Sequence, residues 1–387
     1  MKVLVIPTWY PNGEDKLMGS YHKEFTHALN KYGVKADMLY IARQRLKSPF
    51  KYLTMKKDEV IHEDNYDVYI HNMLNLGPIN FHLQMNSYVR HLDKAFRKYL
   101  KTNSKPDVLH AQVSVPAGYA AVKIGEKYDI PVVVTEHGGL LERFFKDEPF
   151  KNYGLYVLEH SYYSVVSQYM REIALKYTDE CPMLPNQVDT HLFKNDIKRE
   201  VKDKFNLIMC CALREGKRLD IAFEALKKLK EEDFPVHLDI IGDGFYEESF
   251  KNSAKENGVE DIVTFHGRKE KSELPPYFEK AHALLISSEI ESFAIPGIEA
   301  MASGLPVIST DCGGPRDFIT NKTGILCPVN DPLSMYNAIK EMKEKYQAFQ
   351  KNDLEAMANN FSEETVVALA KKLYEKAIKE GFKKGTN

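Results

Sequence analysis

Two glutamates on either side of a helix start constrain this chain more than any other feature. Residues 287–317, SSEIESFAIPGIEAMASGLPVISTDCGGPRD, place Glu291 and Glu299 eight positions apart, with Pro296 between them. The apolar run LLIS before the glutamates ends a strand, and a proline in the first turn favours a helix that continues to about Met301. The sequence therefore predicts a strand, a loop that carries Glu291, and a helix that carries Glu299 about one turn from its start.

The N-terminal end of such a helix can bind phosphate, because its first N–H groups are unpaired and its dipole is positive there. The two carboxylates cannot bind phosphate themselves. They are suited to accept hydrogen bonds from hydroxyl groups, such as those of ribose and of a sugar. The alternative is a buried strand–helix unit whose glutamates are merely solvated.

Short apolar runs alternate with amphipathic stretches along the chain, which is typical of βαβ units and parallel sheets. The expected strands are VLVIP, ADMLYI, VYIHNM, DVLHA, PVVVTEH and YSVVS in the first half, and NLIMCCAL, HLDIIG, IVTFHG, ALLISS, PVIST and GILCPV in the second. Two prolines and an asparagine interrupt the pattern at residues 181–189. With 387 residues, 43% of them hydrophobic, the chain can bury two cores.

Composition excludes some classes of function. The net charge of −2 argues against a protein that binds nucleic acid over its whole surface. The five cysteines lack metal-ligand spacing, so reduced and buried thiols are expected. Because there is no apolar run of about 18 residues, we expect a soluble, cytoplasmic protein.

The segment 287–317 resembles the retaining, nucleotide-sugar-dependent glycosyltransferases of family 4, which have the two-domain GT-B architecture. The family's Glu-x7-Glu element falls on Glu291 and Glu299, and its glycine pair falls on Gly313 and Gly314. The resemblance extends over nearly the whole chain, through MKVLVIPTWYPN, DVLHAQVSVPAG, PVVVTEHGG, LPNQVDTHLF, HLDIIGDG and VTFHG, in the family's order.

This resemblance implies an α/β fold with two Rossmann-like domains that face each other across a cleft. Residues 1–183 would form the acceptor-binding domain and residues 184–364 the nucleotide-sugar-binding domain. Residues 365–387 would form a C-terminal helix that returns to the N-terminal domain.

Candidate site residues follow the predicted strands, where ligands bind in open α/β sheets. They are Gly19 after the first strand, His137 at the end of PVVVTEH, Lys217 after NLIMCCAL, Gly242 after HLDII, and Glu291 after ALLISS.

A nucleotide diphosphate leaving group must be stabilised by a metal, by cationic side chains or by backbone donors. The chain contains no Asp-x-Asp motif, so we expect no metal and no cofactor other than the nucleotide sugar as co-substrate. Lys217, the backbone N–H of Gly19 and the helix start at Phe293, Ala294 and Ile295 remain as candidates to hold the diphosphate.

The resemblance implies that Lys217 contacts the diphosphate. The family usually has an arginine five residues earlier, and this chain has Ala212 there. Arg214 or Arg218 is expected to supply the missing charge. The alternative for Lys217 is an ordinary exposed loop lysine.

Four other roles are implied by the resemblance. His137 would contact the reacting end and the 6-position of the donor sugar, and Glu291 would bind its 3- or 4-hydroxyl. Glu299 would bind the ribose hydroxyls, and the backbone at Arg268 would contact the base. Asn186 is expected to be a turn residue at the hinge.

A basic surface is expected on the acceptor side. Residues 41–57 hold six Lys or Arg and no acid, interleaved with Leu, Phe, Tyr and Met. Residues 82–101 add five cations on an expected helix: Arg90, Lys94, Arg97, Lys98 and Lys101. Such a surface suits anionic lipid headgroups at the inner face of the plasma membrane or a lipid-diphosphate acceptor. It equally suits an ordinary solvated face.

The main hypothesis is a retaining glycosyltransferase that moves a hexose or N-acetylhexosamine from a UDP- or GDP-linked donor. Its acceptor would be a glycan or a lipid-linked molecule in the synthesis of cell-surface polysaccharide or glycoconjugate. The alternatives are a nucleotide-sugar 2-epimerase and a non-catalytic, transferase-like partner that binds glycan or protein.

Overall fold

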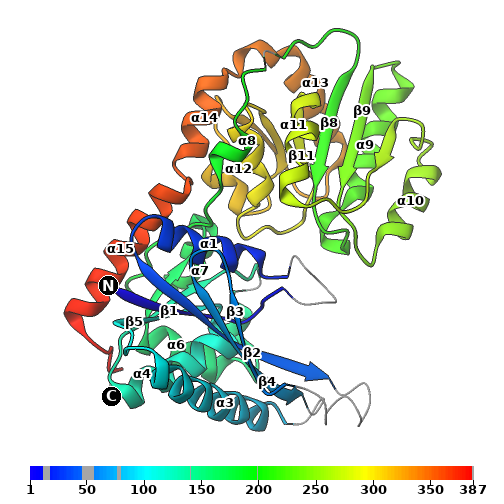
Figure 1. Ribbon diagram of the computed structural model, residues 1–387. Coiled ribbons are helices and arrows are strands. Elements are labelled where there is room, and N and C mark those ends of the chain that lie inside the picture. The colour runs from blue at the N-terminus through cyan, green and yellow to red at the C-terminus, as the bar shows by residue number, and fades with distance from the viewer. Residues whose placement is uncertain (12–17, 46–55, 76–79, 140, 198, 386–387) are drawn as a thin grey trace. The chain divides into compact units, whose positions relative to one another are not determined.

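The chain folds into two compact units, each built around its own sheet (Figure 1). The computed structural model describes residues 1–385 except 12–17, 46–55, 76–79, 140 and 198. Unit 1 comprises Met1–Val166, Met170–Asn186 and Val366–Asn387, and unit 2 comprises Ser167–Tyr169 and Gln187–Thr365. The predicted α/β class with two Rossmann-like domains is confirmed, whereas the binding roles expected of each domain stay predictions.

The sheet of unit 1 has the strand order β3-β4-β2-β1-β5-β6-β7. All of its neighbours pair in parallel except β3 and β4. Without β3, this is the doubly wound 3-2-1-4-5-6 order of dinucleotide-binding folds. The strands are β1 (Lys2–Pro7), β2 (Lys35–Arg45), β3 (Asp58–His62), β4 (Asp67–Asn75), β5 (Val108–Gln112), β6 (Val132–Glu136) and β7 (Tyr162–Val165).

Helices cover both faces of this sheet, which explains why central strands such as β1 are buried along their full length. The helices are α1 (Ser20–Lys31), α3 (Phe81–Thr102), α4 (Tyr119–Tyr128), α5 (Arg143–Lys146), α6 (Lys151–His160), α7 (Gln168–Ala174) and α15 (Glu363–Glu380), with a helical turn η1 (Ser114–Gly118). α1 and α15 share one apolar core with the sheet, and α3, α4 and α6 pack against one another.

The C-terminal helix α15 returns to unit 1, as predicted. Its residues Val366, Ala370, Tyr374 and Ala377 recur every three or four positions and are fully buried in the unit 1 core. Figure 1 shows this helix, in red, lying beside the blue N-terminal strands of unit 1. The apolar stripe read from the sequence therefore belongs to the core of the first domain.

A buried hydrogen-bond chain fastens α15 to the sheet. The Tyr374 hydroxyl lies 2.7 Å from His110 Nδ1, and His110 Nε2 lies 2.8 Å from Thr135 Oγ1. Thr135 contacts Ser164 Oγ at 2.9 Å, and Ser164 donates to the carbonyl of Val134. Because Ser164 donates outward, Thr135 must donate to Ser164, and His110 must donate from Nε2. Tyr374 therefore donates to Nδ1 of a neutral imidazole, in keeping with burial, which lowers the pKa of His110 to about 3.

The sheet of unit 2 has the order β10-β9-β8-β11-β12-β13 and is parallel throughout. Its strands are β8 (Phe205–Cys210), β9 (Val236–Ile241), β10 (Val263–Phe265), β11 (Ala283–Ile286), β12 (Val307–Thr310) and β13 (Gly324–Cys327). This order again matches the doubly wound fold, whose ligand site lies beyond the carboxyl ends of the two central strands. Those strands are β8 and β11.

The helices of unit 2 form two groups. α9, α10 and α13 share the main core with the sheet, and α12 packs against α8 and α14. The bounds are α8 (Thr190–Phe193), α9 (Leu219–Glu231), α10 (Glu247–Glu256), α11 (Pro275–Lys280), α12 (Ile295–Ala302), α13 (Pro332–Glu344) and α14 (Lys351–Asn359). Short turns are η2 (Glu215–Lys217), η3 (Lys271–Glu273), η4 (Gly314–Asp317) and η5 (Tyr346–Ala348).

Two further findings concern expectations from composition. No helix among the described residues is long and apolar enough to cross a membrane. All five cysteines are free, and Cys181, Cys312 and Cys327 are buried. Cys210 and Cys211, at the end of β8, are only half-buried, contrary to expectation.

We predict that Tyr374→Phe destabilises unit 1 by about 1–3 kcal/mol, because it removes the hydroxyl that donates to the buried His110 Nδ1 and leaves only the longer contact from Gln112 Nε2. Urea unfolding followed by tryptophan fluorescence measures this, since the chain's single tryptophan, Trp9, lies in unit 1. Tyr119→Phe is the matched control, because the hydroxyl of this half-buried tyrosine has no hydrogen-bond partner among the described residues. Equal losses in the two variants would contradict the role given to the chain of hydrogen bonds.

Candidate functional site

The loops that follow β8 and β11 are held together at the centre of the unit 2 sheet. The two strands are parallel neighbours, so their carboxyl ends meet at one edge. The backbone N–H of Glu289 donates to the carbonyl of Gly216 at 2.9 Å, and Ser287 Oγ donates to the carbonyl of Lys217 at 2.7 Å. Residues 74 positions apart in sequence, Lys217 and Glu291, are thereby brought into one site.

Lys217 and Glu291 form an ion pair. Lys217 Nζ lies 2.5 Å from Glu291 Oε1, and Ser288 Oγ donates to the same oxygen at 2.6 Å. Burial disfavours the charged form of Lys217, but the adjacent Glu291 carboxylate outweighs burial and raises the pKa of Lys217 overall. The structure thus holds a positively charged lysine at the carboxyl end of the two central strands.

The glycine pair allows the Glu291 loop to pack closely on the loop after β12. Glu291 N–H donates to the carbonyl of Cys312, and Gly314 N–H donates to the carbonyl of Glu291, both at 2.8 Å. A Cβ on Gly314 would lie 2.4 Å from the Cα of Phe293, and Gly313 has φ of 113°. Side chains at these two positions would push the Glu291 loop out of place.

Helix α12 begins one residue after a strained backbone position. Ala294, at the N-cap, has φ of 70° in the left-handed region, which is unusual for a residue other than glycine. Ile295 is the first helical residue and Pro296 follows it, as the sequence predicted. Phe293 is buried against Phe318 and Phe361, so its side chain anchors the helix start and does not face a ligand.

Glu299 lies in α12, with only 5% of its surface exposed. Its Oε1 is 3.3 Å from Lys271 Nζ, at the start of η3. A buried carboxylate beside a lysine can accept hydrogen bonds from ligand hydroxyl groups, which is the chemistry that ribose binding needs. No motif in the sequence indicated Lys271.

Gly242 lies where three loops converge. It has φ of 138°, a Cβ there would lie 1.9 Å from the carbonyl oxygen of Cys211, and its N–H donates to the carbonyl of Gly267 at 2.9 Å. Only glycine fits this position. Arg268 follows Gly267, so its backbone lies on the loop that Gly242 holds.

The two arginines proposed to replace the missing cation at Ala212 differ in their partners. Arg218 binds Asp220 through Nε and Nη2 and also contacts Asn330. Arg214 is exposed and forms no ion pair among the described residues. Arg214 is therefore the better candidate to assist Lys217.

Gly19 and His137 lie in one group of residues in unit 1. Gly19 caps α1 with φ of 72°, and a Cβ there would lie 2.5 Å from the carbonyl oxygen of Trp9 and 3.1 Å from the His22 ring. The His22 ring lies 5.5 Å from the His137 ring and is fully buried. Neither nitrogen of His22 has a hydrogen-bond partner in the described part of the chain, and burial lowers its pKa well below the usual value.

His137 is flanked by two amide side chains. Its Nε2 lies 2.6 Å from Gln112 Oε1, and its Nδ1 lies 3.0 Å from Asn186 Oδ1. Burial lowers the pKa of His137 to about 3, although the hydrogen bond with Asn186 acts in the opposite direction. His137 is therefore neutral near pH 7, with one N–H, and it can bond to a ligand hydroxyl only in place of one of these amides. It cannot serve as a permanent positive charge.

Glu136 orders the loop that carries His137. Its fully buried carboxylate accepts hydrogen bonds from the N–H groups of Ser114, His137 and Gly138 at 2.8–3.0 Å, and from Ser114 Oγ at 2.6 Å. Burial raises the pKa of Glu136 despite these donors. Glu136, Gln112 and Asn186 were missed as site residues. Only their positions at strand ends and at the domain junction could have indicated them.

The basic segment 41–57 lies partly outside the described residues, which exclude 46–55. Its membrane role therefore stays a prediction. On α3 the five expected cations are all exposed.

No group of three or more His, Cys, Asp or Glu that could hold a metal occurs among the residues that the structure describes.

Comparison with protein families gives two matches that together span most of the chain. Residues 193–363 match the model described as glycosyl transferases group 1, and residues 19–192 match the model described as glycosyltransferase family 4.

Named relatives agree with these matches. The chain is 25% identical over 331 residues to an uncharacterized glycosyltransferase, MJ1178, of Methanocaldococcus jannaschii, covering 82% of this chain and 90% of the relative. It is 26% identical over 290 residues to N-acetyl-alpha-D-glucosaminyl L-malate synthase of Bacillus anthracis, covering 69% and 74% of the two chains.

Solved structures show the same fold. Sucrose-phosphate synthase from Thermosynechococcus elongatus aligns with a TM-score of 0.75 at 17% identity, over 98% of this chain and 100% of that one. Anabaena Alr3699/HepE, solved in complex with UDP, aligns with a TM-score of 0.72 at 17% identity, over 97% and 100%. The chain therefore belongs to the glycosyltransferases of the group 1, family 4 type, with the paired α/β domains of the GT-B fold.

Proposed function

We propose that this glycosyltransferase transfers a hexose or N-acetylhexosamine, with retention of configuration, from a UDP- or GDP-linked donor to a glycan or lipid-linked acceptor. The observation that carries the proposal is the Lys217–Glu291 pair at the carboxyl ends of β8 and β11, beside the start of α12. Lysine and helix N–H groups match a diphosphate, and carboxylates match sugar and ribose hydroxyls.

In this proposal the acceptor hydroxyl attacks the anomeric carbon as the bond from that carbon to the diphosphate oxygen breaks. The nucleoside diphosphate leaves with the bonding electrons and takes the hydroxyl proton. Lys217, with Arg214 nearby in sequence, stabilises the negative charge that develops on the leaving oxygen. Two groups of unit 1, the neutral His137 side chain and the N–H of Gly19, also bind the donor.

Three relatives support the choice of substrates. Alr3699/HepE was solved with UDP and with UDP-glucose. Two relatives that match a part of this chain are named for the biosynthesis of amylovoran and of colanic acid. We accordingly place the protein at the cytoplasmic face of the membrane, in polysaccharide or glycoconjugate synthesis, with weak anionic membrane association through its basic surface.

The reaction is proposed to need no metal, because the sequence lacks an Asp-x-Asp motif and Lys217 can compensate the diphosphate charge. We predict that the purified protein binds UDP or GDP in preference to ADP and CMP, and releases the nucleotide slowly from the matching donor sugars. Release should continue in excess EDTA. A complete loss of release in EDTA that Mg²⁺ or Mn²⁺ restores would overturn metal independence, and binding of none of the four nucleotides would overturn the proposed function.

We predict opposite signatures for the two glutamates. Glu299→Ala should weaken UDP binding roughly 10–100-fold, the effect of losing charge-assisted hydrogen bonds to ribose. Glu291→Gln should leave UDP affinity within about threefold, because it frees Lys217 for the diphosphate, and should lower kcat at least about 100-fold through lost sugar contacts.

Calorimetric titration and a nucleotide-release assay measure both effects. Glu289→Ala is the matched control, since Glu289 is an exposed carboxylate of the same loop. UDP affinity that is unchanged in Glu299→Ala would remove the ribose assignment.

A further inference from the structure

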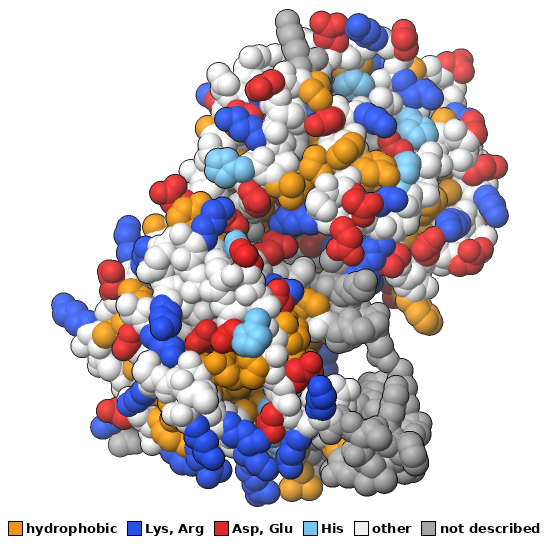
Figure 2. Space-filling model, viewed as in Figure 1, with side chains coloured by type: hydrophobic (Ala, Val, Ile, Leu, Met, Phe, Trp, Pro, Cys, Tyr) orange, Lys and Arg blue, Asp and Glu red, His pale blue; other side chains and the backbone are white. Residues whose placement is uncertain are grey.

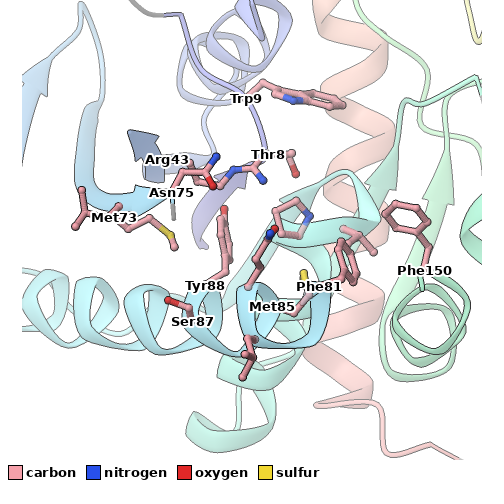
Figure 3. A pocket seen from close by; sticks show the side chains of 15 residues that line it. Thr8, Trp9, Arg43, Met73, Asn75, Phe81, Met85, Ser87, Tyr88 and Phe150 are labelled. Atoms are coloured by element: carbon pink, nitrogen blue, oxygen red, sulfur yellow. The ribbon is translucent and has the colours of Figure 1, made fainter. Parts of the chain in front are cut away.

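A cavity of about 330 Å³ lies wholly within unit 1, at the carboxyl ends of β1, β2 and β4. The first two turns of α3 and the turn η1 close it on the other sides (Figure 3). Its volume is at the lower end of the range for small-molecule pockets. None of the unit 2 residues proposed to hold the nucleotide lines it.

The walls of the cavity are mainly apolar. Phe81 and Phe150 pack edge to face with ring centroids 4.9 Å apart, and Met73 and Met85 extend the same apolar surface. In Figure 3, Trp9 lies across the cavity from the α3 side chains. This lining suits an apolar chain or ring, and it does not suit a fully hydroxylated sugar.

One end of the cavity carries a buried, unpaired hydroxyl next to an exposed arginine. The Tyr88 hydroxyl is buried and has no hydrogen-bond partner among the described residues. Figure 3 shows this hydroxyl directed from α3 toward Arg43. Arg43 is exposed, forms no ion pair within the described part of the chain, and is the only charged residue among the described residues that line the cavity.

Arg43 cannot accept the Tyr88 proton. Arginine has only donors, so even an Arg43 that donates to the Tyr88 oxygen would leave the Tyr88 O–H without an acceptor. Leaving a buried hydroxyl unpaired costs about 1–3 kcal/mol. An oxygen that accepts from both side chains at once would remove this penalty, and an anionic oxygen does so most strongly.

The surrounding surface has the same sign as Arg43. Figure 2 shows Lys and Arg side chains gathered over α3, the helix that supplies Tyr88 to the cavity. No acidic residue is present among the described lining residues. The α3 cations lie beyond the turns that line the cavity, so it is chiefly Arg43, with no acidic neighbour among the described lining residues, that favours an anionic ligand over a neutral one.

We infer that this cavity binds an anionic amphiphile, with its apolar body against Phe81, Phe150 and Trp9 and its phosphate or carboxylate between Arg43 and Tyr88. Given the proposed function, on which this step rests, that amphiphile is the sugar acceptor. The transferase would then act on an acceptor with an apolar portion next to an anionic group, not on a free neutral glycan.

Trp9 makes the inference directly measurable, because it is the single tryptophan of the chain and lines the cavity. Monomeric octyl phosphate, octanoate, octyl glucoside and inorganic phosphate are titrated separately while Trp9 fluorescence is recorded. We expect a saturable change with octyl phosphate or octanoate, whichever head group the site accepts. Octyl glucoside and inorganic phosphate should bind at least about tenfold more weakly.

Variants identify the anchoring groups. Arg43→Gln should weaken the better anionic probe about 10–100-fold and leave octyl glucoside within twofold, and Tyr88→Phe should weaken the same probe several-fold. Arg90→Gln, which removes an exposed charge of α3 that does not line the cavity, should leave all probes within twofold. Thermal unfolding without probe checks that each variant is folded.

Three results would overturn the inference: no saturable change with either anionic amphiphile, equal affinity for octyl glucoside, or unchanged binding in Arg43→Gln. UDP titration by calorimetry in the same samples shows whether only the amphiphile inference fails or whether the proposed function fails as well. UDP binding without amphiphile binding would remove only the acceptor class. Amphiphile binding without any nucleotide binding would remove the transferase assignment and leave an amphiphile site.

Discussion

The ion pair between Lys217 and Glu291 is the central interaction of the unit 2 site, because it keeps both charged groups at the carboxyl ends of β8 and β11. Taking two charges out of water is unfavourable, so a half-buried pair of this kind persists only where the fold holds both groups in place. Here the fold does so through backbone contacts between the loops after β8 and β11 and through the Ser288 hydroxyl. A diphosphate would offer Lys217 more negative charge than one carboxylate does, and Glu291 would then be free to bind hydroxyl groups.

The rest of unit 2 supports this arrangement. Gly313 and Gly314 let the Glu291 loop approach its neighbour, Gly242 lets the β9 loop approach the β8 loop, and the strained Ala294 directs the first N–H groups of α12. Each is a position where an ordinary side chain or backbone conformation would not fit. A strained backbone conformation costs free energy. It persists only where the surrounding packing fixes it, and such positions are common at functional sites.

Much of this could be predicted from the sequence, because the motifs are local. The buried strands of both sheets, the helix after Pro296 and the apolar stripe of α15 follow from periodicity and from proline and glycine placement. Strand β3 was missed because its residues are mostly exposed and it pairs only with β4, so no buried pattern marks it.

Contacts between distant segments could not be predicted. The partners of His137 come from two other segments, at Gln112 and Asn186, and Lys271 reaches Glu299 from another loop. The unit 1 cavity is formed by the ends of three strands, by α3, by the turn η1 and by Phe150, and the unpaired state of the Tyr88 hydroxyl is a property of packing. Periodicity reports which face of an element is buried, but not which polar group there lacks a partner.

We propose that Lys217 binds the diphosphate of a nucleotide sugar. The most direct test compares the affinities of UDP, UMP and uridine for the wild-type protein and for Lys217→Gln by calorimetry. We predict that the substitution weakens UDP binding at least about tenfold, as expected for a charge-assisted contact, and leaves uridine binding within twofold. An equal loss for uridine and UDP, or no loss for UDP, would contradict the account.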